Sequence, residues 1–411
     1  MQEIDINQQT PHKSAYTVSM DPVLNPYSPG AGNTPRALVG RDADLQAFDI
    51  AVKRIALGRH DRSVIVSGLR GVGKTVLLRE YGRIAEREGW IHEHVEARED
   101  VDFVRVVAEL VRRAILRLSA TKRLAAHASR AAGALKAFQI RWNLPDGGDL
   151  TLRADPLMGT ADSGLLDRDL ASLFNETGQL ARGYDCGVLL TVDEMQFLPK
   201  DHFTDFIMGL HEVSQLNLPI MVAGAGLPSL LSAAGDARSY AERLFDFRTV
   251  GRLSSETSAA ALTEPAEIEG VTWSTGALSR IIELTGGYPY FLQEFGKQAW
   301  FAAPGPDEIT EQDVEVAVPL ATDQLDSGFF RVRFDRTTDA ERAYLEAMAR
   351  VGGTEVASGA VANAMGKTTT GVAQTRDALI RRGLCYSPRH GVIAFTVPMF
   401  DQYLRRRTEW A

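Results

Sequence analysis

Residues 68–75 have the composition and spacing of a loop that binds phosphate groups. They read Gly-Leu-Arg-Gly-Val-Gly-Lys-Thr and fit the pattern G-x-x-x-x-G-K-[ST] without a mismatch. Glycines let the backbone curl so that successive N–H groups face an anion, and a following helix adds the positive end of its dipole. Lys74 can reach terminal phosphates, and the Thr75 hydroxyl can bind Mg²⁺. The loop therefore predicts a nucleotide phosphate site.

Two adjacent carboxylates, Asp193 and Glu194, follow the apolar run 188–192. A buried strand that ends in acids is the expected partner of a phosphate loop, with Asp193 in the Mg²⁺ shell. Glu194 is placed to orient and activate an attacking water, which favours hydrolysis over binding alone. The alternative is a solvated strand end with two surface acids, and the upstream phosphate loop disfavours it.

These groups need elements that hold them in position. Short apolar runs of strand type and segments of helical spacing alternate from residue 63 to residue 222. Alternation of this kind predicts an α/β fold, in which a mostly parallel sheet is covered by helices on both faces. The strand segments are 63–67, 90–95, 188–192 and 218–222, and the helical segments are 76–85, 101–143, 166–182 and 202–215.

Together, these residues resemble the additional-strand P-loop ATPases, and within them the AAA+ and STAND groups near the archaeal and origin-recognition-type ATPases. The resemblance covers about residues 38–400. It implies a P-loop core, a helical lid, and ATP or ADP bound with Mg²⁺, with Thr75 and Asp193 as metal ligands. It also implies these nucleotide-binding residues: Arg41, Gly68, Leu69, Arg70, Gly71, Val72, Gly73, Lys74, Thr75, Val76 and Pro289.

Three further segments resemble motifs of that family. Residues 39–42 are similar to its opening motif, which packs near the adenine. Gly287-Tyr288-Pro289 is similar to the Gly-x-Pro motif of STAND lids, whose proline lies against the base. The alternative is a proline that starts a helix after a glycine turn, and both can be true at once. Residues 239–245 resemble the helix before the last strand of the sheet. By that likeness Arg243 is a catalytic arginine finger offered to a neighbouring subunit of a homo-oligomer. An arginine on a solvated helix is the alternative, and Arg238 competes for the role.

Two departures from the family pattern are visible. Residues 223–226 read Ala-Gly-Ala-Gly where many AAA+ proteins carry a polar sensor residue. No arginine occurs in 285–300, where a second sensor arginine is expected. Both departures favour a switch, in which the nucleotide sets the conformation, over a processive motor.

The last 73 residues show three helical segments followed by two short strands, which resembles a winged helix-turn-helix. In versions that bind DNA, the third helix enters the major groove and the wing contacts the backbone or minor groove. The candidate DNA contacts are Thr369, Thr370, Gln374, Arg381 and Arg389. The alternative is a module that only packs against protein.

The charge of the chain is unevenly distributed. The 411 residues have a net charge of −8, but 142–338 carry −17, 106–141 carry +7 and 339–411 carry +3. The whole-chain sum excludes only a uniformly basic protein, and the basic block at 106–141 has the residues that neutralise phosphates. A solvated helix face, or one that docks on the acidic region, explains this block equally well.

Composition bounds the remaining expectations. Hydrophobic residues make up 45% and charged residues 24%, which is ordinary for a globular protein. No apolar run reaches the length of a membrane span, the N-terminus lacks a signal core, and the two distant cysteines predict reduced thiols. We therefore expect a cytoplasmic protein without a membrane partner.

The predicted organisation has four parts. A flexible arm covers 1–37, and a P-loop core covers 38–253 with a basic helical insertion at about 106–165. A helical lid and linker cover 254–338, and a winged helix covers 339–411. The expected function is an ATP-hydrolysing ATPase that binds double-stranded DNA under nucleotide control. Two alternatives are a STAND-type signalling switch whose winged helix contacts protein, and a DNA-binding regulator with negligible ATP turnover.

Overall fold

A five-stranded parallel sheet forms the centre of the larger domain. The computed structural model describes residues 20–30, 32–98, 101–119, 125–145, 154–230, 238–305 and 307–409. The sheet has the strand order β2-β3-β4-β1-β5, and every neighbouring pair is parallel. Its strands are β1 (Ser63–Ser67), β2 (Ile91–Glu96), β3 (Val188–Asp193), β4 (Ile220–Gly226) and β5 (Phe245–Thr249). Because β4 separates β1 from β3, the sheet has the additional strand that the family resemblance implies.

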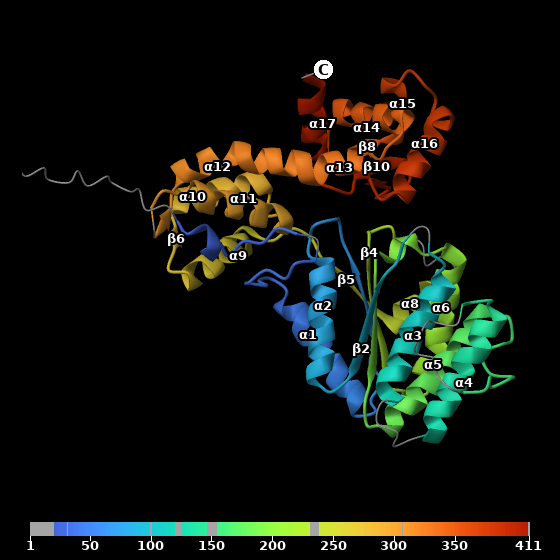
Figure 1. Ribbon diagram of the computed structural model, residues 1–411. Helices are drawn as coiled ribbons and strands as arrows, with labels where there is room; N and C mark the ends of the chain where they lie inside the picture. The colour runs from blue at the N-terminus through green and yellow to red at the C-terminus, as the bar shows by residue number, and fades with distance from the viewer. Residues whose placement is uncertain are drawn as a thin grey trace, which may run out of the picture.

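Helices cover both faces of this sheet (Figure 1). Alternate residues of a strand point to opposite faces, so Val64 and Val66 enter one buried cluster while Ile65 enters the other. One face carries α1 (Asp42–Ala56) and α2 (Lys74–Arg87). The other carries α3 (Phe103–Ser119), α4 (Ala125–Arg141), α5 (Leu166–Gly183), α6 (Lys200–Ser214) and α8 (Arg238–Leu244). The predicted α/β fold with a doubly covered parallel sheet is confirmed.

Strand β4 extends further than the apolar pattern predicts. The predicted strand ends at residue 222, but β4 continues through Ala223-Gly224-Ala225-Gly226. A side chain at Gly224 would place its Cβ 2.1 Å from the sulfur of Met195, which is fully buried in the short 3₁₀ turn η2 (Met195–Phe197). The small residues are therefore required by the turn that follows β3, and they still form a strand.

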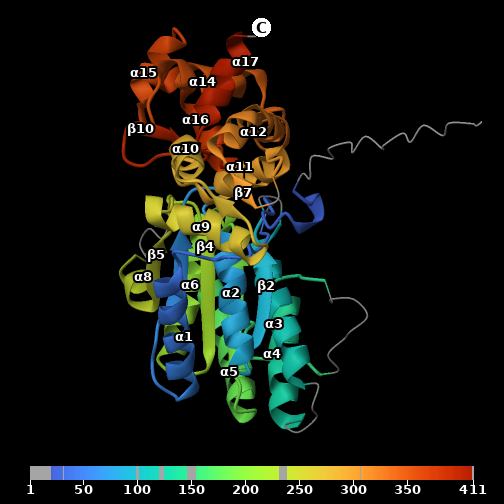
Figure 2. The same ribbon diagram turned by 90° about the vertical axis from the view of Figure 1, so that its left-hand side faces the viewer.

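The lid is helical and lies beyond the edge of the sheet (Figure 2), and it leads into a long helical arm (Figure 1). It contains α9 (Ser255–Ile268), α10 (Thr275–Thr285), α11 (Pro289–Ala302) and α12 (Glu311–Gln324), with the short strand pair β6 (Thr272–Trp273) and β7 (Glu308–Ile309). Helix α12 continues without a break into a π-helix, η4 (Leu325–Phe330), and then into α13 (Arg331–Phe334). This arm connects the lid to the C-terminal module (residues 339–409).

The C-terminal module contains the predicted helices and strands and two further elements. Its expected parts are α14 (Asp339–Val351), α15 (Ser358–Ala364), α16 (Thr369–Arg381), β9 (Cys385–Tyr386) and β10 (Val392–Phe395). The Thr368 hydroxyl caps α16 by accepting from the Gly371 N–H. The additional elements are β8 (Val356–Ala357), which pairs with β10, and α17 (Phe400–Glu409), whose Phe400 and Tyr403 stack against Phe330. The arrangement is consistent with a winged helix, which stays a prediction.

The segment before α1 differs from the flexible arm that its composition predicts. Its described residues, 20–30 and 32–37, include the 3₁₀ turn η1 (Pro22–Leu24) and pack against the lid. The buried Tyr27 hydroxyl donates to the Leu262 carbonyl at 2.5 Å and accepts from the Trp273 indole at 2.8 Å. The Trp300 indole donates to the Asp21 carbonyl at 3.0 Å. Residues 1–19 of the predicted arm lie outside the described residues, and the other predicted domain boundaries stay predictions.

The cysteine and membrane expectations can be compared with the structure. Cys186 is half-buried and Cys385 is fully buried, and both are free thiols. Burial raises the pKa of the Cys385 thiol. In the part of the chain that the structure describes, no helix has the length and apolar character needed to cross a membrane.

Candidate nucleotide site

The phosphate loop lies between the end of β1 and the start of α2. Gly71 and Gly73 have φ values of 83° and 94°, in the left-handed region that favours glycine. Lys74 is 6% exposed, and its ammonium group donates to the carbonyls of Gly68 and Leu69, both at 2.9 Å. Burial lowers the pKa of Lys74, and the nearby Glu194 and Asp193 carboxylates oppose this shift. A buried cation inside a curled loop suits an anionic ligand.

Thr75 and Asp193 meet at the carboxyl edge of the sheet. The Thr75 hydroxyl donates to a carboxylate oxygen of Asp193 at 2.6 Å, although the two residues stand on α2 and β3. They meet because parallel strands end at the same edge, so the loop after β1 faces the end of β3. A hydroxyl and a carboxylate side by side are hard oxygen ligands, which fits the Mg²⁺ that the sequence predicts here.

Glu194 follows Asp193 in an unusual backbone conformation. Its φ of 53° and ψ of 37° lie in the left-handed region, which costs about 1–3 kcal/mol for a residue other than glycine and is often found at functional sites. Its carboxylate accepts from the Gln196 amide and lies 3.6 Å from a guanidinium nitrogen of Arg70. The strand end therefore aims this acid at the phosphate loop rather than into bulk solvent.

The lid closes over the loop at the start of α11. The Tyr290 N–H donates to the Gly71 carbonyl at 3.2 Å, and Pro289 is the first residue of the helix. A Cβ at Gly287, whose φ is 73°, would lie 2.4 Å from the Leu253 carbonyl oxygen, so glycine is required there. Arg41 also contacts the loop, since its guanidinium donates to the carbonyls of Val72 and Gly251. The start of α11 and the segment that contains Arg41 thus both contact the phosphate loop.

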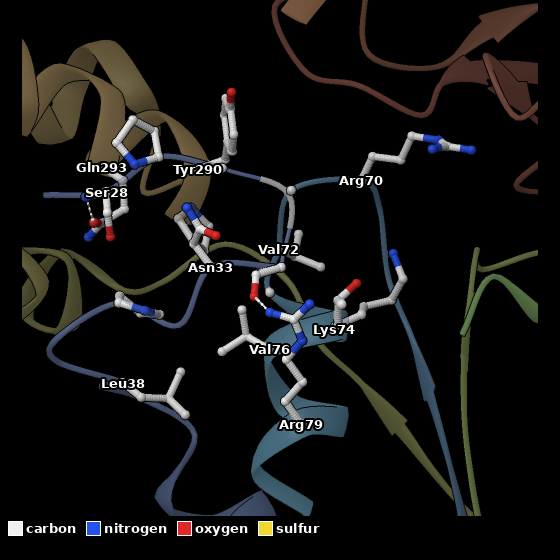
Figure 3. Close-up of a pocket in the computed structure, with 18 of the residues that line it drawn as sticks. Ser28, Asn33, Leu38, Arg70, Val72, Lys74, Val76, Arg79, Tyr290 and Gln293 are labelled. Atoms are coloured by element: carbon white, nitrogen blue, oxygen red, sulfur yellow. Dashed lines mark hydrogen bonds between the residues drawn. The ribbon is translucent and has the colours of Figure 1, made fainter. Parts of the chain in front are cut away.

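A cavity of about 530 Å³ lies among these segments (Figure 3). This volume is within the range of small-molecule sites. Its lining includes the predicted residues Arg41, Arg70, Gly71, Val72, Gly73, Lys74, Thr75, Val76, Asp193, Glu194 and Pro289. Gly68 and Leu69 are not part of the lining, and they contribute instead by holding Lys74.

Several lining residues were not predicted from the sequence. Ser28, Asn33 and Leu38 come from the segment before α1, and His94 and Glu96 come from β2. Gln293 lies one helical turn after Pro289, so its spacing could have indicated a shared face. The Ser28 N–H donates to the Gln293 side-chain oxygen at 3.2 Å. Arg333 enters from α13, and no local pattern around it points to the cavity.

Arg243 does not reach the cavity of its own chain. It is exposed in the last turn of α8, and β5 begins two residues later, where Phe245 pairs with Ser63 at the start of β1. The phosphate loop follows the end of β1, so Arg243 lies at the opposite edge of the sheet. Its role as an arginine finger could apply only to a neighbouring chain, and it stays a prediction. The side chain of Arg238 lies outside the described part of the chain.

The candidate DNA contacts are on the surface of the C-terminal module. Thr369, Thr370, Gln374 and Arg381 of α16 are all exposed. The spacing of Thr370, Gln374 and Arg381 places them on one face of the helix. Arg389 is also exposed, but its guanidinium forms an ion pair with Glu355 at 2.6 Å. Of these five residues, Arg381 is the one that brings positive charge to the face of α16.

Many cations of the basic block are matched by nearby acids. Arg112 pairs with Glu109 at 2.8 Å, Arg117 with Glu93 at 3.3 Å, and Arg130 with Glu176 at 2.7 Å. Phe138 is buried and the Trp142 indole donates to Asp169, so neither ring is offered to a base. The Arg130–Glu176 pair joins α4 to α5, which belongs to the acidic region 142–338, and it supports the alternative that the basic block docks on that region. Lys122 and Arg123 of this block lie outside the described residues.

Comparison with known proteins supports the interpretation of this site. Residues 37–222 match the family described as AAA ATPase domain, and residues 327–404 match a domain of unknown function (DUF8462). No curated protein matches the chain at a significant level of similarity.

Two solved structures share the fold. A Walker-type ATPase of Pyrococcus abyssi, PABY2304, has a TM-score of 0.51 and 16% identity over 91% of this chain and 98% of that one. The ORC2 protein of Aeropyrum pernix, solved in ADPNP-ADP complexes, has a TM-score of 0.50 and 16% identity over 92% of this chain and 98% of that one. Residues 37–222 thus form an AAA ATPase domain, and the protein is a P-loop ATPase.

Proposed function

We propose that the protein binds ATP with Mg²⁺ in the cavity beside the phosphate loop, hydrolyses it, and uses the nucleotide state to control DNA binding by the C-terminal module. Lys74 and the loop N–H groups hold the phosphates. Thr75 and Asp193 hold the metal, which neutralises charge on the phosphates when it is bound. Pro289 and Arg41 flank the part of the cavity that takes the base.

Glu194 acts as the group that activates water. Phosphoryl transfer to water requires mainly positioning and charge neutralisation, and a carboxylate near the terminal phosphate can orient the water and accept its proton. Its neighbours support this role. The Gln196 amide and the Arg70 guanidinium hold the carboxylate in one orientation beside the phosphate loop.

One observation carries the proposed nucleotide control, namely the contacts of Arg70. Its N–H donates to the Thr396 carbonyl at 3.2 Å, and its Nε donates to the Gly383 carbonyl at 3.2 Å. Figure 3 shows the side chain extending sideways from the phosphate loop. The same guanidinium is paired with Glu194. A single residue of the phosphate loop therefore contacts both the water-activating acid and the C-terminal module, so a nucleotide that reorders the loop also acts on the module.

A second candidate function follows from the weak charge of α16. Thr369, Thr370 and Gln374 are uncharged, and Arg389 is already paired with Glu355. Specific DNA binding depends strongly on cations that neutralise phosphates. This surface also suits a STAND-type switch in which the module contacts a protein partner.

DNA binding across a salt series, with and without ATP and Mg²⁺, separates these functions. Fluorescence anisotropy with a labelled duplex should show binding that weakens with salt and changes with ATP. Lys74→Ala should remove the ATP effect and leave the salt dependence. Absence of binding at low salt would reject the DNA-binding function and leave the protein switch. ATP hydrolysis, measured in parallel, tests the enzymatic part independently.

A further inference from the structure

Arg333 is a half-buried arginine that lines the nucleotide cavity from the arm that connects the lid to the C-terminal module. Its guanidinium lies over the Phe329 ring, 4.0 Å from the ring centre, and donates to the Phe329 carbonyl at 2.5 Å. Phe329 in turn stacks on Tyr290 at 4.5 Å, and Tyr290 follows the lid proline. The side chain is therefore held in place by aromatic packing before any ligand binds.

The guanidinium of Arg333 forms no ion pair with an acid among the residues that the structure describes, where no carboxylate lies within 4.0 Å of it. Burial lowers the pKa of Arg333 to about 10, the positive charge of Arg70 adds to this effect, and the charge of Glu194 opposes it. Placing a cation in such a position is costly unless an anion compensates it. The cavity beside it is the site proposed for nucleotide phosphates.

The element that carries Arg333 also differs from its surroundings. It follows a π-helix, η4, and π-helical turns occur frequently at functional sites. The last residue of η4, Phe330, stacks against Phe400 and Tyr403 of the C-terminal module. In contrast, α11 carries no arginine, so the lid helix beside the loop does not supply this charge.

We propose that Arg333 binds the terminal phosphate of the nucleotide, so that the arm distinguishes a nucleoside triphosphate from a diphosphate and passes this difference to the C-terminal module. This proposal rests on the proposed ATP site. It adds a phosphate ligand from α13, in the arm that connects the lid to the C-terminal module. This ligand lies outside both the phosphate loop and the lid motif. Arg333 lines the same cavity as Arg70 and Glu194, and it is near enough for its charge to interact with both of them.

The test compares the binding of ATP and ADP to variants of the full chain. A fluorescent ATP analogue that is not hydrolysed and the matching ADP analogue are titrated into wild type and Arg333→Ala with Mg²⁺. We expect the ATP affinity to fall about ten-fold or more, and the ADP affinity to change less than two-fold, because only ATP has the third phosphate. Arg333→Lys, which keeps the charge, should recover part of the ATP affinity.

Arg331→Ala is the matched control, because Arg331 lies on the same short helix but is exposed and pairs with Asp335 at 3.4 Å. It should leave both affinities unchanged. Retained ADP binding in Arg333→Ala also shows that the variant folds. An equal fall for ATP and ADP, or no fall for either, would overturn the proposal. If Lys74→Ala binds ATP as wild type does, the proposed ATP site itself fails, and this result is distinct from a failure at Arg333.

Discussion

At the scale of single residues, the site combines buried or half-buried charges that hold one another in place. Lys74 is stabilised by loop carbonyls, Thr75 donates to Asp193, and Glu194 is restrained by Gln196 and Arg70. Charged groups fixed in this way need little rearrangement when charge develops during the reaction, which is the basis of electrostatic preorganisation. The chemistry thus depends on small distances that single substitutions can change.

Glu194→Gln should separate hydrolysis from binding. The amide keeps the size of the side chain but cannot accept a proton from water. We expect kcat for ATP hydrolysis to fall about 100-fold or more, with ATP affinity changing only a few-fold. A phosphate-release assay and a binding titration measure the two quantities. If wild type hydrolyses ATP no faster than Glu194→Gln, the regulator with negligible turnover becomes the better description.

His92 should make the stability of the fold sensitive to acid. Its pKa is lowered to about 4, mainly because burial disfavours the charged imidazole, and further by His94 and Arg117. In an unfolded chain the group titrates near 6.5. Between these values the unfolded state binds more protons, so the unfolding free energy decreases as the pH falls below about 6.5.

Urea denaturation at pH 7 and pH 5 measures this effect. We expect His92→Gln to reduce the loss of unfolding free energy between the two pH values by about 1–2 kcal/mol, allowing for screening by solvent. His390→Gln is the control, because His390 is exposed. Equal losses in wild type and His92→Gln would show that this imidazole does not titrate differently on unfolding.

At the scale of elements, close contacts between neighbouring segments decide which residues the chain tolerates. The turn after β3 packs directly on β4, and the segment before α1 packs on the lid through Tyr27, Trp273 and Trp300. These contacts fix the walls of the cavity, because Ser28 and Asn33 belong to that segment. The elements therefore position the site through packing rather than through the motif residues alone.

Gly224→Ala tests the packing of β4 against the turn. The new Cβ would lie 2.1 Å from the Met195 sulfur, and both residues are in the interior of the domain. Forcing an extra methyl group into a packed core costs about 1–3 kcal/mol, so thermal unfolding should occur several degrees lower. Gly251→Ala should leave the melting temperature unchanged, since nothing lies within 4 Å of its Cβ position. Equal melting temperatures for the two variants would contradict this account of the small residues.

At the scale of the whole molecule, the phosphate loop contacts the lid and the C-terminal module at the same time. Gly71 accepts from Tyr290 of the lid, and Arg70 bonds to Gly383 and Thr396 of the module. Phe330 of the connecting arm stacks on α17, so the module is attached at two places. A change at the loop can therefore act on both the lid and the module.

Arg70→Ala should loosen the C-terminal module from the phosphate loop. We expect faster hydrogen exchange in residues 383–396 of the variant without nucleotide. The bond to the Gly383 carbonyl depends on the Arg70 side chain and is lost, while the bond from the Arg70 backbone N–H to Thr396 remains. Arg59→Ala, at an exposed position after α1, is the control. Exchange identical to wild type in that segment would show that the contact does not hold the module.

The sequence by itself determined the parts of this protein that depend on neighbouring residues. A strand, a glycine-rich turn and a helix start are local, so the loop 68–75 and the acids Asp193 and Glu194 were predictable. Runs of buried apolar residues likewise predicted the parallel sheet and its two helical layers, because each strand of such a sheet is covered on both faces.

Only the tertiary structure decided which distant residues join the site. Tyr27 bonds to a carbonyl 235 residues away and Arg70 to one 313 residues away, and no local pattern records such partners. Arg333 likewise enters the cavity from an arm whose direction depends on packing against α11 and α17. The composition of residues 1–37 suggests a flexible segment, but its described residues 20–30 and 32–37 pack on the lid, where Tyr27 contacts the buried Trp273 and Trp300. Local patterns specify elements, while the surfaces that these elements bury against one another specify the completed site.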